Sequence, residues 1–162
     1  MGLIAFVKDA GSKLFGGKDE PAPVTQPDPQ KVREYQERRL AAAIAQHVET
    51  LGLGVKDLGV AVEGHTAIVT GMADTQADRE KVLVAVGNVH GIAEVDDRLA
   101  VAAPVEAEAT FHTVERGDTL SKIAQKHYGK AGAYMKIFEA NKPMLSDPDK
   151  IYPGQVLRIP PA

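Results

Sequence analysis

The sequence of 162 residues contains no cysteine and no tryptophan, and aromatic residues make up only 5% of it. The absence of cysteine excludes disulfides, thiolate metal sites and cysteine nucleophiles. The scarcity of aromatic residues means that any core must consist mostly of Val, Ile, Leu and Ala. A disulfide-free chain of this size is typical of a reducing compartment, so we expect a cytoplasmic protein.

Long apolar runs are also missing. The first seven residues are largely apolar, but Lys8 and Asp9 follow at once, and a membrane span needs ~20 apolar residues. No basic residue precedes the run, as a secretory signal would require. Phe6 stands where a myristoylation motif has Ser or Thr. We therefore expect no stable membrane insertion.

Motifs for catalysis are lacking as well. None of the three serines lies in a nucleophile-elbow context, and no phosphate-binding glycine loop is present. The five histidines show no closely spaced metal-binding pair, and lone helical histidines such as His47 and His127 are more often packing or surface residues than catalysts. The sequence therefore predicts a binding protein and not an enzyme.

The acidic pair Asp96-Asp97 resembles a metal site only at first sight. It falls on a predicted strand, where neighbouring side chains point to opposite faces and cannot clamp one ion. We expect instead a solvated strand with an ion pair to Arg98, or a contact between domains. No calcium-binding loop is present either, so a hard divalent cation is not expected.

Charge is unevenly distributed along the chain. Residues 1–109 contain 11 Lys and Arg against 17 Asp and Glu, whereas residues 110–162 contain 8 against 5. An acidic first part and a basic second part attract each other, so we expect an intramolecular contact between them. The basic part has no aromatic stacking surface, and nucleic-acid binding is not expected.

Hydrophobic periodicity divides the chain into two small α+β domains. Thr75 and Thr119 are predicted helix N-caps, and Gly129 a helix C-terminal residue.

The expected first part comprises a helix over 3–14, a proline-rich linker, a helix over 31–51, a hairpin around 63–65, a helix over 76–87 and a strand over 92–101. The expected second part comprises a strand over 111–114, two helices, a turn at Pro153-Gly154 and a strand over 155–159. The domain boundaries are an N-terminal helix at 1–17, a linker at 18–30, a domain of order αββαβ at 31–103, a linker at 104–110 and a domain of order βααβ at 111–160.

Both domains resemble known families. Residues 111–160 resemble a LysM domain along their whole length, through the motifs Gly117-Asp118-Thr119-Leu120, Tyr128-Gly129, Asn141 and Ile151-Tyr152-Pro153-Gly154-Gln155. Residues 31–103 are similar to a BON domain, through Val69-Thr70-Gly71, Gly91-Ile92 and Val95-Asp96-Asp97.

The two domains in this order, behind MGLIAFVKDAG, resemble the small bacterial BON–LysM proteins, a family with a cytoplasmic potassium-binding member. The resemblance covers nearly the whole chain apart from the proline-rich linker. It implies a monomer that binds one potassium ion selectively and becomes more compact on binding. We expect such a site to tolerate Rb⁺ and Cs⁺ and to reject Na⁺.

Potassium is selected in proteins by rings of neutral backbone carbonyls. Helix C-termini supply such oxygens, because their last four carbonyls lack intrahelical partners and lie at the negative end of the helix dipole. Residues 86–92 and 7–11 are two such places. With the resemblance, they give the expected donors Val7, Ala10, Gly87, Val89 and Ile92. The residues alone favour ordinary helix caps, because most helices that end in glycine bind nothing. Only the family resemblance favours the ion site.

The LysM resemblance implies an alternative function. LysM domains generally bind N-acetylglucosamine polymers such as peptidoglycan, in a groove between two loops. The corresponding residues here are Gly117, Asp118, Thr119, Leu120, Ile151, Tyr152, Pro153 and Gly154. A cytoplasmic chain does not meet assembled peptidoglycan, whereas a protein of the cell envelope does.

Overall fold

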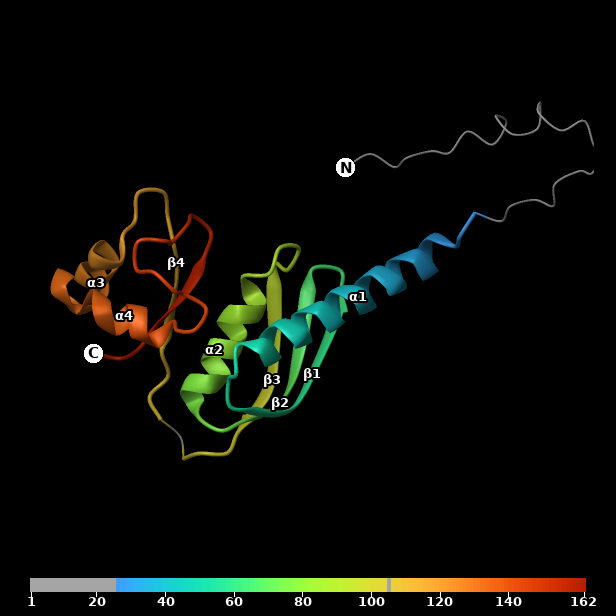
Figure 1. The fold of residues 1–162 in the computed structure, drawn as a ribbon, viewed down its shortest axis with the longest axis horizontal. Helices are drawn as coiled ribbons and strands as arrows, with labels where there is room; N and C mark the ends of the chain where they lie inside the picture. The colour runs from blue at the N-terminus through green and yellow to red at the C-terminus, as the bar shows by residue number, and fades with distance from the viewer. Residues whose placement is uncertain (1–25, 105) are drawn as a thin grey trace, which may run out of the picture.

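The computed structural model describes residues 26–104 and 106–162, which form two domains (Figure 1). The first domain comprises α1 (Pro29–Thr50), β1 (Val55–Glu63), β2 (Thr66–Ala73), α2 (Gln76–Gly87) and β3 (Glu94–Val101). The second comprises β4 (Thr110–Thr113), α3 (Leu120–Tyr128), the 3-10 helix η1 (Ala131–Ala133), α4 (Tyr134–Ala140) and β5 (Val156–Ile159). The predicted α+β class and both element orders are confirmed, with η1 as an addition. The helix expected over 3–14 lies outside the described residues.

The first domain is a three-stranded sheet covered by two helices. β1 and β2 form an antiparallel hairpin, and the α2 crossover places β3 parallel to β2 on its other side. α1 and α2 cover one face of this sheet, and the N-terminal half of α1 projects beyond it (Figure 1). The core between these layers consists of small aliphatic side chains, as the composition predicts: Ala41, Ile44, Val48, Val62, Ala67, Val69, Val82, Ala85, Val86 and Leu99.

Short polar side chains set the helix ends where the sequence predicts them. The Thr75 hydroxyl accepts a hydrogen bond of 3.1 Å from the Asp78 N–H at the start of α2. The Thr119 hydroxyl accepts one of 3.2 Å from the Lys122 N–H at the start of α3. Gly129 ends α3 at φ +69°, a left-handed conformation that costs glycine little.

A bulge interrupts β1 near its start. The register with β2 shifts between Lys56 and Gly59, and Asp57 adopts φ +52°. The facing residue Gly71 has φ +137°, and a Cβ there would lie 2.9 Å from the Lys56 carbonyl oxygen. Only glycine fits this position, so the bulge is built into both strands of the hairpin.

The acidic pair on β3 forms two separate ion pairs. Asp96 pairs with Arg98 at 2.7 Å, as the sequence predicts, and Asp97 pairs with Arg79 of α2 at 2.7 Å. The two carboxylates thus serve different partners, which agrees with their expected positions on opposite faces of the strand.

The second domain packs α3 and α4 against a two-stranded antiparallel sheet of β4 and β5. Asn141 follows α4 and is 1% exposed. Its amide accepts from the Arg158 N–H and donates to the Arg158 carbonyl, both at 2.8 Å. The core of this domain is separate from that of the first: Val114, Leu120, Ile123, Ala124, Ile137, Phe138, Leu145, Leu157 and Ile159.

A buried ion pair joins the two domains. Glu80 of α2 is 2% exposed, Arg158 of β5 is 9% exposed, and their side chains meet at 2.5 Å. Glu80 also accepts hydrogen bonds from the Gln76 side chain and, at 2.8 Å, from the Ala109 N–H. Burial raises the pKa of the Glu80 carboxyl, but these three hydrogen bonds outweigh burial and hold the pKa below its ordinary value. The carboxylate thus fixes α2, β5 and the connection between the domains.

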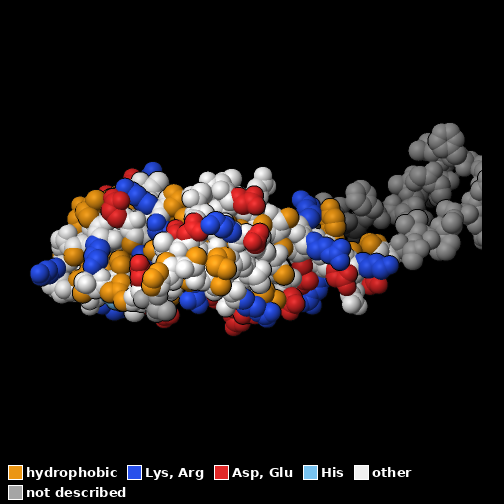
Figure 2. Space-filling model, turned by 90° about the horizontal axis from the view of Figure 1, so that it is seen from below, with side chains coloured by type: hydrophobic (Ala, Val, Ile, Leu, Met, Phe, Trp, Pro, Cys, Tyr) orange, Lys and Arg blue, Asp and Glu red, His pale blue; other side chains and the backbone are white. Residues whose placement is uncertain are grey.

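The surface of the described residues carries charges of both signs. Figure 2 shows acidic and basic side chains interspersed over one face of both domains, without a continuous basic patch on that face. In residues 26–104 and 106–162, no helix is both long enough and apolar enough to cross a bilayer.

The buried ion pair generates a stability prediction. We expect Glu80→Ala to lower the free energy of unfolding by about 3 kcal/mol, because it leaves a buried guanidinium unpaired. Urea denaturation followed by circular dichroism measures this change. Glu94→Ala, at an exposed position, is the control and should change stability by less than about 0.5 kcal/mol. Equal losses in the two variants would contradict the prediction.

The same carboxyl predicts a pH dependence. Its pKa is lower in the folded than in the unfolded chain, where it lies near the ordinary 4.5. The stabilisation is therefore fully present above that value and is lost as the pH falls through the lower, folded pKa. The stability difference between the wild type and Glu80→Gln should be constant near neutral pH and shrink below about pH 4.5.

Candidate functional site

The candidate site is the loop that follows α2, residues 87–92. Gly87 is the last residue of α2, and Asn88 caps the helix with φ −84° and ψ 0°. Successive N–H groups then bond backwards along the chain: Asn88 to the Val84 carbonyl, Val89 to that of Val86 and Ile92 to that of Val89, each at 3.1 Å. These bonds curl the backbone of residues 88–92 into tight turns.

Gly91 fixes the far end of this loop. Its φ of +96° lies in a region that other residues rarely adopt. Its carbonyl oxygen is 3.0 Å from the His65 Nδ1 atom, at the turn of the β1–β2 hairpin. The loop is thus held at one end by α2 and at the other by the hairpin.

Three of the expected donors, Gly87, Val89 and Ile92, lie together in this loop. The Val89 oxygen already accepts the Ile92 N–H, although a carbonyl oxygen has a second lone pair. Within residues 26–104 and 106–162, no donor is found at the Gly87 and Ile92 oxygens. The other two expected donors, Val7 and Ala10, lie outside the described residues.

The electrostatics of the loop favour a cation over an anion. The C-terminal end of a helix carries roughly half a negative charge. The last turn of α2 holds no basic side chain that would neutralise it. In the described part of the chain, no group of three or more His, Asp or Glu side chains converges on a metal position. The loop therefore offers neutral oxygens and a helix dipole, and no carboxylate cluster.

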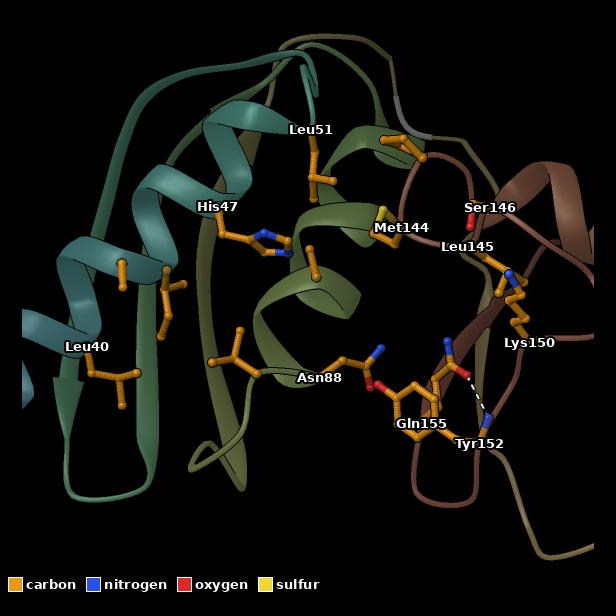
Figure 3. Close-up of a pocket in the computed structure, with 15 residues that line it drawn as sticks. Leu40, His47, Leu51, Asn88, Met144, Leu145, Ser146, Lys150, Tyr152 and Gln155 are labelled. Atoms are coloured by element: carbon orange, nitrogen blue, oxygen red, sulfur yellow. Dashed lines mark hydrogen bonds between the residues drawn. The ribbon is translucent and has the colours of Figure 1, made fainter.

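A cleft of about 480 Å³ lies beside the loop, between the two domains. Leu40 and His47 of α1 and Leu51, which caps that helix, form one side of it (Figure 3). Asn88 and Val89 of the loop also line it. The opposite wall comes from the second domain: Pro143, Met144, Leu145, Ser146, Lys150, Tyr152 and Gln155. Met144 also packs against the core of the first domain, so the cleft is bounded by a true interdomain contact.

Asn88 connects the loop to the second domain. Its side-chain oxygen accepts from the Val156 N–H at 2.8 Å, and its amide nitrogen donates to the Val156 carbonyl at 2.9 Å. The two bonds pair one side chain with both backbone groups of the first residue of β5. Sequence reasoning does not find this contact, because an asparagine after a helix is also an ordinary cap residue.

Comparison with known proteins decides the family. The potassium binding protein Kbp of Escherichia coli O6:H1 is 47% identical over 161 residues, which cover 99% of each chain. This chain belongs to the Kbp family. The BON domain family matches residues 36–103, and the LysM domain family matches residues 112–160. An uncharacterized protein of Deinococcus radiodurans is 32% identical over 133 residues, which cover 75% of this chain and 52% of that protein.

In the LysM domain of this Kbp-family chain, the expected groove loop at 151–154 is bonded to Val114, the residue that follows β4. The Gly154 N–H donates to the Val114 carbonyl, and the Val114 N–H donates to the Gln155 carbonyl, both at 2.8 Å. The expected groove residues differ in solvent exposure. Leu120 is 2% exposed and belongs to the core, whereas Tyr152 is 50% exposed. Tyr152 also lines the interdomain cleft (Figure 3), so this loop faces the BON domain as well as solvent.

The LysM domain also contains a hydrogen-bonded network of three side chains, which sequence spacing does not reveal. His112 Nε2 lies 3.1 Å from the Asp118 carboxylate, and His112 Nδ1 lies 3.2 Å from His127 Nε2. Hydrogen bonds from the Glu115 N–H and from His112 hold the pKa of Asp118 below its usual range. Burial lowers the pKa of His127, and His112 and Lys126 lower it further. The Asp118 carboxylate therefore orients His112, and through it the network with His127.

The two loop glycines generate a prediction, because they differ in backbone conformation. We expect Gly91→Ala to destabilise the protein by about 1–3 kcal/mol, since alanine is strained at φ +96°. Gly87→Ala is the matched control: its Cβ would lie 3.5 Å from Val95, an ordinary contact. Thermal unfolding of both variants measures the difference. A loss at position 87 as large as that at 91 would contradict it.

Proposed function

We propose that this chain binds a single potassium ion through backbone carbonyl oxygens at the loop that follows α2. The observation that carries the proposal is the 47% identity, over 99% of both chains, to a protein named for potassium binding. The geometry of residues 87–92 supports it, because the loop follows the negative end of a helix. Within the described residues, the Gly87 and Ile92 oxygens also have no hydrogen-bond donor.

The chemistry of the loop suits a large monovalent cation. Potassium is weakly hydrated, and neutral carbonyl oxygens can replace its water shell. A divalent cation would instead favour carboxylates, and the described residues offer no cluster of them. We propose that Rb⁺ and Cs⁺ are accepted and that the smaller Na⁺ is rejected.

The proposed donors come from two segments. Gly87, Val89 and Ile92 contribute oxygens from the loop, and Val7 and Ala10 contribute them from the N-terminal segment. Because the donors lie far apart in sequence, binding would draw these segments together, and the chain would become more compact. We propose that it acts as a monomeric, non-enzymatic potassium sensor or buffer in the cytoplasm.

Calorimetry in potassium-free buffer tests the ligand. We expect heat of binding with K⁺, Rb⁺ and Cs⁺ and none with Na⁺. The melting temperature should also rise with K⁺ at fixed ionic strength, because a ligand at 100 times its Kd stabilises the folded state by about 2.7 kcal/mol. Choline chloride is the control. An equal shift in K⁺ and choline would indicate screening, and an equal response to Na⁺ would exclude a selective site.

The LysM match favours glycan binding as a second candidate function. Its loops at 117–120 and 151–154 would take an N-acetylglucosamine polymer, with the exposed Tyr152 ring as a surface for a sugar. Titration with chitin oligomers, followed by NMR of these loops, separates the two candidates. A response there without a response to potassium would favour the glycan.

Deletion of residues 2–15 tests the contribution of the N-terminal segment. If Val7 and Ala10 supply oxygens, the truncated chain should lose potassium binding while the LysM domain stays folded. A membrane anchor predicts the opposite, that the truncated chain still binds potassium and loses only association with liposomes. Calorimetry and a liposome flotation assay distinguish these results.

A further inference from the structure

The outer edge of β5 is closed by two asparagine side chains in the same way. Asn141, from the LysM domain itself, pairs with both backbone groups of Arg158 at 2.8 Å. Asn88, from the BON domain, pairs with both backbone groups of Val156 at 2.8 and 2.9 Å. The backbone groups of two positions on one strand edge thus find their partners in different domains. Arg158 is paired by a residue of the LysM domain, and Val156 by a residue of the BON domain.

Asn88 is also part of the candidate ion loop. The Gly87 carbonyl and the Asn88 N–H belong to one planar peptide unit, and that N–H donates to the Val84 carbonyl. The next peptide unit joins the Asn88 carbonyl to the Val89 N–H, which donates to the Val86 carbonyl. The two peptide planes that flank Asn88 therefore set both the Gly87 oxygen and the direction of the Asn88 side chain.

We propose that Asn88 is the positioning residue through which potassium binding strengthens the contact between the BON and LysM domains. This inference rests on the proposed potassium site. An ion that fixes the Gly87 oxygen fixes the same peptide unit that aims the Asn88 amide at Val156. The LysM strand, in turn, holds the loop in its ion-binding conformation.

Thermodynamic linkage makes this coupling reciprocal. If docking of Val156 onto Asn88 raises potassium affinity by some factor, potassium raises the docking equilibrium by the same factor. Couplings of this kind typically amount to about 5–150-fold. We therefore expect removal of the Asn88 amide to weaken potassium binding at least about fivefold.

The second interdomain contact allows Asn88 to be tested without separating the domains. The Glu80–Arg158 pair lies about two turns earlier on α2 and involves no residue of the loop. It remains in Asn88→Ala. The side chain of Asn88 does not bond within its own helix cap, which is made by its backbone N–H. The variant should therefore fold, with the domains still joined by the Glu80–Arg158 pair and by the packing of Met144 on the BON core.

Amide hydrogen exchange of the full chain provides the readout. In the wild type, potassium should slow exchange of the Val156 N–H relative to choline at the same ionic strength. The Arg158 N–H is the internal control, because it donates to the Asn141 side chain of the same domain. Its exchange rate should not change with potassium. In Asn88→Ala, the Val156 N–H should exchange faster and no longer respond to potassium.

The variants separate the possible outcomes. Glu94→Ala changes an exposed side chain on β3, outside the loop, and should retain wild-type affinity and the Val156 response. Wild-type affinity in Asn88→Ala would overturn the inference, as would a wild type that binds potassium without any change at Val156. A wild type that gives no heat with potassium would instead remove the proposed function itself, before any variant is compared.

Discussion

A two-stranded sheet leaves an unpaired edge on each strand, and the unpaired edge of β5 determines how this molecule is assembled. Its backbone groups are satisfied by asparagine amides and not by a third strand. One of those amides comes from the neighbouring domain, so the LysM domain is completed by the BON domain. The Arg158 side chain extends from this strand to the buried Glu80. The interdomain cleft and the position of the 87–92 loop follow from these contacts.

Local features of the fold could be predicted from the sequence because they depend on neighbouring residues. Thr75 and Thr119 cap helices by bonding to N–H groups three residues away, and the glycine at 129 is required by a left-handed backbone. The loop after α2 was identifiable for the same reason, since glycines beyond an apolar helix indicate freed carbonyls. The element order, and with it the α+β class, depends on such short-range patterns.

Contacts between distant residues could not be predicted in this way. Asn88 and Val156 are 68 positions apart, and Glu80 and Arg158 are 78 apart. Opposite net charges of the two parts indicate attraction but do not identify partners. Glu80 did offer one clue, since it is a charged residue on the buried face of α2 and needs a partner there. His112 and His127 come together only because β4 packs beside α3, which no spacing of histidines reveals.

The bulge in β1 has a consequence for how copies of this protein behave at high concentration. β1 lies at the border of its sheet, where a flat strand would be a template for another chain. The positive φ of Asp57 and the register shift beside it break the regular ladder of amide groups. An incoming strand could match only a short part of β1 before the pairing failed. The hairpin thus protects this edge of the sheet through its own backbone, and Gly71 is the residue that makes the bulge possible.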